Sequence, residues 1–178
     1  MHYADIKQFD IANGPGIRIS LFVSGCNHHC KGCFNEVAWD FNYGTIFTEE
    51  TITTIIKYLD SPHIAGLTLL GGEPMEPVNQ KELLPLVKRV KETYPDKTIW
   101  CYTGFLFDKD IIEVMVDKVP QTKELLSYFD VIVDGKFVEE LKNVNLRFKG
   151  SSNQRTILVK ESLESGNIVL WNPPNDEF

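Results

Sequence analysis

The chain has 178 residues, 43% of them hydrophobic and 24% charged, a composition that excludes a disordered or fibrous protein and predicts one folded domain over residues 1–178. Its net charge of −7 repels phosphate, so we expect no nucleic acid partner. The apolar runs are far shorter than the roughly 20 residues that span a bilayer, and the polar N-terminus lacks a signal-peptide core, so we expect a cytoplasmic protein with no membrane partner.

The predicted elements begin with a strand at 17–24, where hydrophobicity alternates. A helix is predicted over 48–60, because its apolar residues recur at helical spacing behind Thr48, a suitable N-cap. A second helix is predicted over 80–93, in which Pro85 is tolerable only near the start. The other predicted elements are strands at 65–70, 97–104, 128–135 and 154–160, one or two helices within 108–128 interrupted at Pro120, and an extra strand or ordered tail at 167–175.

Strands and helices alternate through most of the chain. This order predicts βαβ units with right-handed crossovers, and therefore an α/β fold with a mostly parallel sheet. Five or six strands are too few for a closed eight-stranded barrel, so we expect an open, partial βα barrel. Ligands of such sheets bind at the carboxyl ends of the strands. The unusual stretches all follow predicted strands: the cysteine-rich loop at 25–35, "GGEP" at 71–74, "YTGF" at 102–105 and "DGK" at 134–136.

Three cysteines, Cys26, Cys30 and Cys33, lie close together, whereas the fourth, Cys101, is distant in sequence and is expected to be a small buried hydrophobic residue. Cytoplasmic thiols stay reduced, which disfavours a disulfide. Two kinds of metal site then remain. One is a structural zinc ion that also takes a histidine of the same loop, and the other is an iron–sulfur cluster that keeps one iron open.

The spacing C-x3-C-x2-C after the first predicted strand resembles that of the radical S-adenosylmethionine (SAM) superfamily. The resemblance implies the superfamily's partial barrel. It also implies that Cys26, Cys30 and Cys33 each bind one iron of a [4Fe–4S] cluster, and that SAM chelates the fourth iron through its amino and carboxylate groups. The alternative of a different class is a non-catalytic, zinc-binding interaction module.

A turn of Gly71, Gly72, Glu73 and Pro74 follows the strand predicted at 65–70. The glycines permit a ligand to approach the backbone closely, and the carboxylate is able to accept hydrogen bonds from an ammonium group. The stretch is similar to the superfamily's GGEP motif, which holds the methionine amino end of SAM. A tight turn ended by proline is the alternative, and the nearby cysteine loop favours the SAM role.

Asp134 and Lys136 end a predicted strand and are expected to face the same mouth. They resemble an Asp-x-Lys pair that lies beside bound SAM in glycyl-radical activating enzymes, and an ordinary exposed turn is the alternative. The "YTGF" stretch resembles the Thr-x-Gly-Phe turn of larger activating enzymes. It lacks one residue between Thr103 and Gly104, which argues against a contact by Thr103.

Two further stretches narrow the resemblance. The segment "NGPGIRISLFVSGC" is similar to the lead into the cysteine loop of glycyl-radical activating enzymes. The segment "LRFKGSSNQR" at 146–155, together with "CKGCFN" and the short length, resembles the activating proteins of anaerobic ribonucleoside-triphosphate reductase. Four polar residues of these stretches are expected either to contact the partner or SAM or to be solvated: Arg18, Ser152, Asn153 and Arg155.

The resemblance implies an enzyme in which a reduced cluster cleaves SAM and a glycyl radical forms on the anaerobic reductase. Since only Cys101 remains for a second cluster, the electron is expected from an external donor such as a flavodoxin. The nearer alternative is an activator of another glycyl-radical enzyme, for example pyruvate formate-lyase.

Overall fold

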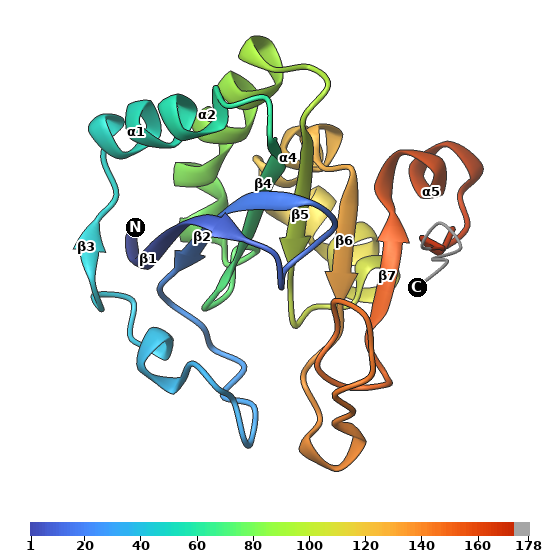
Figure 1. Ribbon diagram of the computed structural model, residues 1–178. Coiled ribbons are helices and arrows are strands. Elements are labelled where there is room, and N and C mark those ends of the chain that lie inside the picture. The colour runs from blue at the N-terminus through green and yellow to red at the C-terminus, as the bar shows by residue number, and fades with distance from the viewer. Residues whose placement is uncertain (173–178) are drawn as a thin grey trace.

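A computed structural model describes residues 1–172, which form a mixed α/β fold around a seven-stranded sheet (Figure 1). The strand order is β3-β1-β2-β4-β5-β6-β7, so β3 and β7 form its two edges. The strands are β1 (His2–Asp10), β2 (Ile17–Val23), β3 (Thr45–Ile46), β4 (Ile64–Gly71), β5 (Thr98–Tyr102), β6 (Val131–Asp134) and β7 (Arg155–Leu158).

The centre of the sheet is parallel, because β2, β4, β5 and β6 all run in one direction. The predicted α/β class is therefore confirmed. The sheet departs from βαβ repetition at both sides, where β1 runs antiparallel to β2 and β7 runs antiparallel to β6. The strand predicted at 154–160 exists as β7 and is an antiparallel member of the mostly parallel sheet. The chain between β6 and β7 has no α-helix to carry it across the sheet, so it returns in the opposite direction.

The helices predicted over 48–60, over 80–93 and within 108–128 are confirmed, whereas α5, which takes the last residues of the strand predicted at 154–160, was not expected. Thr48 caps the first helix, and its hydroxyl accepts a hydrogen bond from the Thr51 amide at 3.4 Å. The interruption at Pro120 separates η2 and α3 from α4. The helices are α1 (Glu49–Leu59), α2 (Pro77–Thr93), the π-helix η2 (Phe107–Met115), α3 (Val116–Lys118), α4 (Thr122–Tyr128), α5 (Val159–Ser165) and the 3-10 turns η1 (Glu36–Trp39) and η3 (Glu139–Leu141).

The expectation that Pro85 lies only near a helix start is wrong. Helix α2 begins at Pro77, so Pro85 stands well inside it. The proline has no N–H to donate to the carbonyl of Lys81, and its ring is exposed to solvent rather than packed in the core. Among residues 1–172, no helix is long and apolar enough to cross a membrane.

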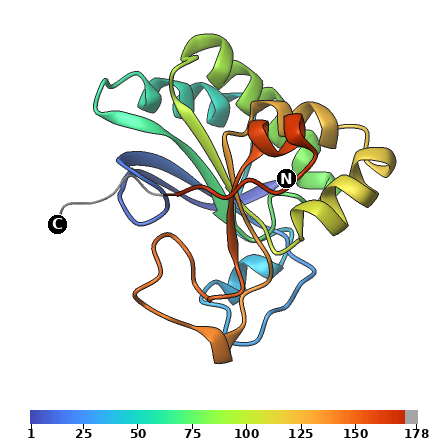
Figure 2. The same cartoon turned by 90° about the vertical axis from the view of Figure 1, so that its right-hand side faces the viewer.

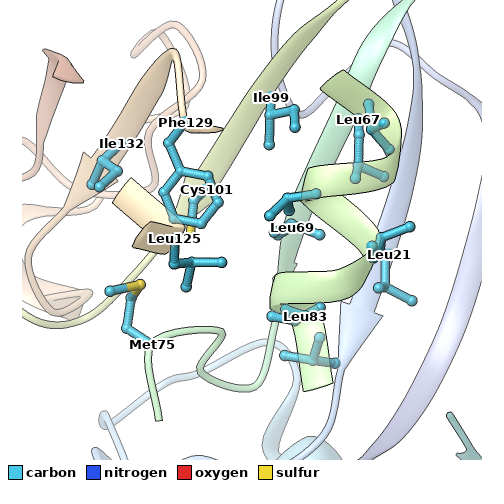
Figure 3. Close-up of a cluster of buried hydrophobic side chains, with 14 of the residues drawn as sticks. Leu21, Leu67, Leu69, Met75, Leu83, Ile99, Cys101, Leu125, Phe129 and Ile132 are labelled. Atoms are coloured by element: carbon cyan, nitrogen blue, oxygen red, sulfur yellow. The ribbon is translucent and has the colours of Figure 1, made fainter. Parts of the chain in front are cut away.

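The main core lies between the sheet and the α-helices, which gather on one side of it (Figure 2). Alternate residues of the parallel strands, such as Leu21, Leu69 and Ile132, point toward helical residues such as Leu83 (Figure 3). Cys101 belongs to the same cluster and is fully buried, so its prediction as a small core residue is confirmed.

Loops and the C-terminal tail cover the other face of the sheet. Trp100 points to this side and packs edge-on against Phe148 and Trp171, with ring centroids 5.7 and 5.2 Å away. The predicted ordered tail is confirmed as far as Trp171, and Leu170 forms an isolated bridge with Ile157. Residues 173–175 of that prediction lie outside the described part of the chain.

Candidate functional site

The cysteine loop leaves the carboxyl end of β2, as the sequence predicts. Cys26, Cys30 and Cys33 all line one cavity of about 400 Å³, with Cys26 buried and the other two partly exposed. The backbone amide of Cys33 donates to the Cys30 carbonyl at 3.1 Å, which folds the second half of the loop into a turn. Three thiols separated in the loop thus converge on one hollow.

Backbone amides point at the sulfur atoms of this loop. Burial raises the pKa of Cys26 to about 11, while hydrogen bonds from the amides of His28 and His29 oppose that rise. Burial also raises the pKa of Cys30, and the backbone of Phe137 opposes it. Amide donors favour a thiolate, the form that binds metal, and a bound metal deprotonates the thiols outright.

The thiols do not gather as ligands of a single ion. Among residues 1–172, no three histidine, cysteine, aspartate or glutamate side chains are placed to share one metal ion. Cysteines that hold an iron–sulfur cluster bind separate iron atoms, so they need not converge on one point. Three thiols around one cavity therefore fit a cluster.

The "GGEP" turn closes directly onto the cysteine loop. Gly71 has a φ of +105°, a conformation that favours glycine. The amide of Gly72 donates to Val23 at 2.7 Å, and the amide of Glu73 donates to the carbonyl of Gly25 at 2.9 Å. A Cβ atom on Gly72 would lie 2.8 Å from that same carbonyl oxygen. Small residues are thus needed for the two segments to touch.

The Glu73 carboxylate is fully buried at the wall of the cavity. Its Oε1 accepts from the Met75 amide at 2.8 Å, and its Oε2 accepts from the Gly104 amide at 2.7 Å. The Nε2 atom of His28 lies 2.9 Å from Oε2. Within residues 1–172, no lysine or arginine forms an ion pair with Glu73. A buried carboxylate facing a cavity in this way suits a ligand that carries positive charge.

Comparison with known proteins identifies the family. Residues 12–157 match the family model described as a 4Fe-4S single cluster domain. Three similar curated proteins bear the name anaerobic ribonucleoside-triphosphate reductase-activating protein. They come from Haemophilus influenzae (44% identity, 86% of this chain and 96% of the relative), phage T4 (42%, 87% and 92%) and Escherichia coli K12 (40%, 86% and 96%). The chain belongs to this family of reductase-activating proteins.

The cluster description of the family agrees with the chemistry of the cavity. Tyr102 also lines the cavity, and its hydroxyl is buried without a hydrogen-bond partner in the described structure. Burial raises the pKa of this phenol, so the hydroxyl keeps its proton and is able to donate. Sequence reasoning did not single out Tyr102, although the residue ends a parallel strand, where ligands are expected.

The expected pair of Asp134 and Lys136 separates in this reductase-activating protein. Asp134 is fully buried and forms two hydrogen bonds with Arg155, of 3.0 and 2.5 Å, so its carboxylate is held between β6 and β7. It does not line the cysteine cavity, whereas its neighbour Gly135 does. Lys136 is exposed, and its charge acts to lower the pKa of Cys30. Only Lys136 of the pair is therefore brought toward the cysteines.

The expectation that Arg18 contacts a partner or SAM is wrong. Its side chain is fully buried and makes five hydrogen bonds inside the sheet. These bonds occupy all five guanidinium N–H groups, so no donor remains for a ligand. The donor-rich guanidinium is instead used to join the loop at Pro15 to β4 and β5.

The polar run before β7 lies at the rim of the site. Ser152 and Asn153 are exposed and, with Arg155, line a second hollow next to the cysteine cavity. The Asn153 amide donates to the Lys136 carbonyl at 2.9 Å. Gln154, a further member of this polar run, lines both hollows and donates to the Gly135 carbonyl at 2.9 Å. This run therefore holds the turn after β6 in place.

Proposed function

We propose that this chain is a radical SAM enzyme that installs a glycyl radical on anaerobic ribonucleoside-triphosphate reductase. Similarity to named reductase-activating proteins over 86% of the chain supports the partner. Three thiols around one cavity support a [4Fe–4S] cluster held by Cys26, Cys30 and Cys33. We further propose that the sheet is a smaller version of the superfamily's partial barrel. The face of the sheet that the loops cover would correspond to the inside of that barrel.

The observation that carries the SAM assignment is the placement of Glu73. Its carboxylate is buried between the cysteine loop and the cavity, with three protein donors and no lysine or arginine partner in the described structure. An ionised carboxylate has about four lone-pair sites, so one remains. The ammonium group of SAM would fill that site and neutralise the charge. Gly71, Gly72 and Pro74 shape the turn that presents it.

A [4Fe–4S] cluster held by Cys26, Cys30 and Cys33 would supply the electron for the reductive cleavage of SAM, the chemistry from which a glycyl radical on the reductase would follow. The chain's own part is to bind, orient and exclude water. Lys136, near Cys30, is placed to attract the SAM carboxylate, and Tyr102, which lines the cavity, has a hydroxyl with no hydrogen-bond partner in the described structure. The partner's glycine must already be close when the radical forms, which an open cavity permits.

The electron must come from outside the chain. Cys101, the cysteine not used by the proposed cluster, is buried in the core. One thiol cannot hold a second cluster, so we propose an external donor such as a flavodoxin. We place the reaction in the cytoplasm, because free thiols and a reduced cluster both require a reducing compartment.

The test is a spectroscopic titration of anaerobically reconstituted protein. Dithionite reduction should give the EPR signal of a [4Fe–4S]⁺ cluster, and SAM should change its shape. Cys30→Ala should abolish SAM cleavage while remaining folded, and Cys101→Ala should keep both the signal and SAM cleavage. Zinc without labile sulfide, or a signal indifferent to SAM, would overturn the proposal in favour of a structural metal site.

The partner is tested separately with the cluster-loaded protein. Incubation with the anaerobic reductase, SAM and a reductant should yield a glycyl-radical EPR doublet on the reductase. Pyruvate formate-lyase is the matched control and should give none. A doublet on pyruvate formate-lyase alone would assign the chain to that enzyme instead.

A further inference from the structure

We propose that His28 is a positioning residue, which fixes the Glu73 carboxylate for the ammonium group of SAM and ties that site to the cluster loop. The inference rests on the proposed function and deepens it. His28 lies between Cys26 and Cys30 in sequence, yet its side chain is only 8% exposed and turns back to Glu73. Sequence reasoning considered this histidine only as a zinc ligand.

Three loops meet at this side chain. The Nε2 atom of His28 contacts Glu73, which follows β4, and the imidazole packs edge-on against Phe105, with ring centroids 4.4 Å apart. Gly104, which follows β5, leaves room for the ring: a Cβ atom there would lie 2.4 Å from Cδ2 of His28. The carboxyl ends of β2, β4 and β5 are therefore joined through one imidazole.

The hydrogen bond has a defined direction. An ionised carboxylate only accepts, so the hydrogen lies on Nε2 of His28 and is donated to Oε2 of Glu73. That oxygen also accepts from the Gly104 amide, while Oε1 accepts from the Met75 amide. Oε2 is thereby fully used, and the remaining lone pair belongs to Oε1. His28 and Gly104 together set the plane in which that lone pair lies.

This arrangement has a consequence for SAM binding. The cysteine loop holds the proposed cluster, and Glu73 holds the proposed ammonium site. The hydrogen bond from His28 to Glu73 fixes the distance between the cysteine loop and the ammonium site. Hydrogen bonds to the ligands of metal centres fix their geometry in the same way. Without the His28 donor, the Glu73 carboxylate keeps only its two hydrogen bonds from backbone amides, so its orientation is less restricted. We expect the main loss in SAM affinity and only a small one in cluster content.

The test compares His28→Phe with His28→Gln. Phenylalanine keeps a ring against Phe105 but has no donor, whereas glutamine keeps an N–H donor of similar reach. SAM dissociation constants are measured from the change in the cluster EPR signal, with iron and sulfide assayed in each sample. A hydrogen bond to a charged group predicts about tenfold weaker binding for His28→Phe. His28→Gln should recover most of the affinity.

Wild-type affinity in a cluster-loaded His28→Phe variant would overturn the inference while leaving the proposed function intact. Wild-type protein that holds a cluster but does not respond to SAM would overturn the proposed function itself. Equal losses in the two variants would assign His28 a packing role instead.

A second measurement needs neither cluster nor SAM. Gly104→Ala places a methyl group in the space of the His28 ring, so it should lower the melting midpoint of the apoprotein. In a His28→Ala background that space is empty, and the same substitution should cost much less. Additive effects of the two substitutions would show that the ring does not occupy this site, and would overturn the inference even if SAM binding fell.

Discussion

Arg18 is a buried cation whose hydrogen bonds all go to neutral oxygen atoms. Its acceptors are the carbonyls of Pro15, Leu67 and Thr98 and the hydroxyls of Thr68 and Thr98, and Trp100 lies 5.7 Å from its guanidinium carbon. Burial lowers the pKa of Arg18 to about 10, because the charged form is removed from water. Such a group contributes to the fold and not to recognition.

Replacement of Arg18 should therefore reduce stability and leave the site chemistry unchanged. Arg18→Ala removes the five hydrogen bonds of a buried side chain and opens a cavity beside Trp100, so we expect a loss of about 3 kcal/mol in the free energy of unfolding. Urea titration measures it. Arg89→Ala, at a half-exposed arginine of α2, is the control and should change stability by less than about 0.5 kcal/mol. Lost SAM binding without lost stability would contradict this assignment.

Arg155 differs from Arg18 because its hydrogen bonds go to charged groups: it joins two carboxylates at the edge of the sheet. It bonds Asp134 and, at 2.8 Å, Asp108 at the start of η2. The side-chain hydrogen bond from Arg155 lowers the pKa of Asp108 in the folded chain. A carboxyl group whose pKa is lower in the folded than in the unfolded chain stabilises the fold at pH values above the unfolded pKa. This stabilisation is lost as the pH falls through the folded pKa.

Asp108→Asn should thus destabilise the chain at pH 7 and cease to matter in acid. Because Asp108 is partly exposed, solvent screens the ion pair and the effect at pH 7 should be only about 0.5 kcal/mol. Unfolding free energies measured at pH 7 and near pH 3 give the difference. Asp117→Asn, at an exposed position of α3, should show no such pH dependence. A larger effect at the lower pH would contradict the sign.

At the scale of elements, α2 contains an internal proline. Pro85 has no N–H to donate to the carbonyl of Lys81, one turn earlier in the helix. Its exposure to solvent means that this position has no packing role that would require proline. The apolar residues Leu83 and Val87 on either side face the core and hold the helix in place.

Pro85→Ala should therefore stabilise the chain. Restoring a helical hydrogen bond is worth part of the ~3 kcal/mol that an interior proline costs, offset by the extra freedom of the unfolded chain, so we expect a gain of about 1 kcal/mol. Chemical denaturation of the apoprotein measures it. Lys88→Ala, exposed on the same helix, is the control for a change in helix propensity alone. A loss of stability would mean that the proline sets a bend on which packing depends.

Elements with strong local signals were predictable from sequence, and those defined by their neighbours were not. The β-branched, alternating run at 17–24 predicts β2, and apolar spacing behind Thr48 predicts α1. Strand β1 is mostly half-buried or exposed, so its sequence shows little hydrophobic alternation, and only pairing with β2 reveals it. The direction of β7 depends on the absence of a helix in the preceding connection, which local patterns do not encode.

The candidate site divides in the same way. The three cysteines and the "GGEP" turn were predictable because their spacing is fixed by local chemistry, and the structure brings both to one cavity. The roles of Arg18 and Asp134 were not predictable. The sequence around an arginine or aspartate is the same whether its side chain binds a ligand or joins another strand of the sheet. The contact between His28 and Glu73 joins residues far apart in sequence, and only the assembled sheet places them together.

The whole molecule separates its core from its reactive site. The large hydrophobic cluster lies between the sheet and the α-helices, whereas the cysteine cavity lies at the carboxyl ends of the strands under the loops. The helices and strands thus have a core that does not involve the three thiols of the cysteine loop. A small zinc-dependent module differs, because metal binding there supplies the folding free energy.

Removal of iron should therefore leave the chain folded. Chelation of the oxidised, cluster-loaded protein should preserve its far-UV circular dichroism and a cooperative thermal transition. The melting midpoint should fall by only about 2–4 °C for each kcal/mol of lost cluster binding. Cys30→Ala, which is expected to hold no intact cluster, should melt like the chelated wild-type protein. Loss of the circular dichroism signal on chelation would instead show that the metal is structural. It would then favour the alternative of a zinc-binding interaction module.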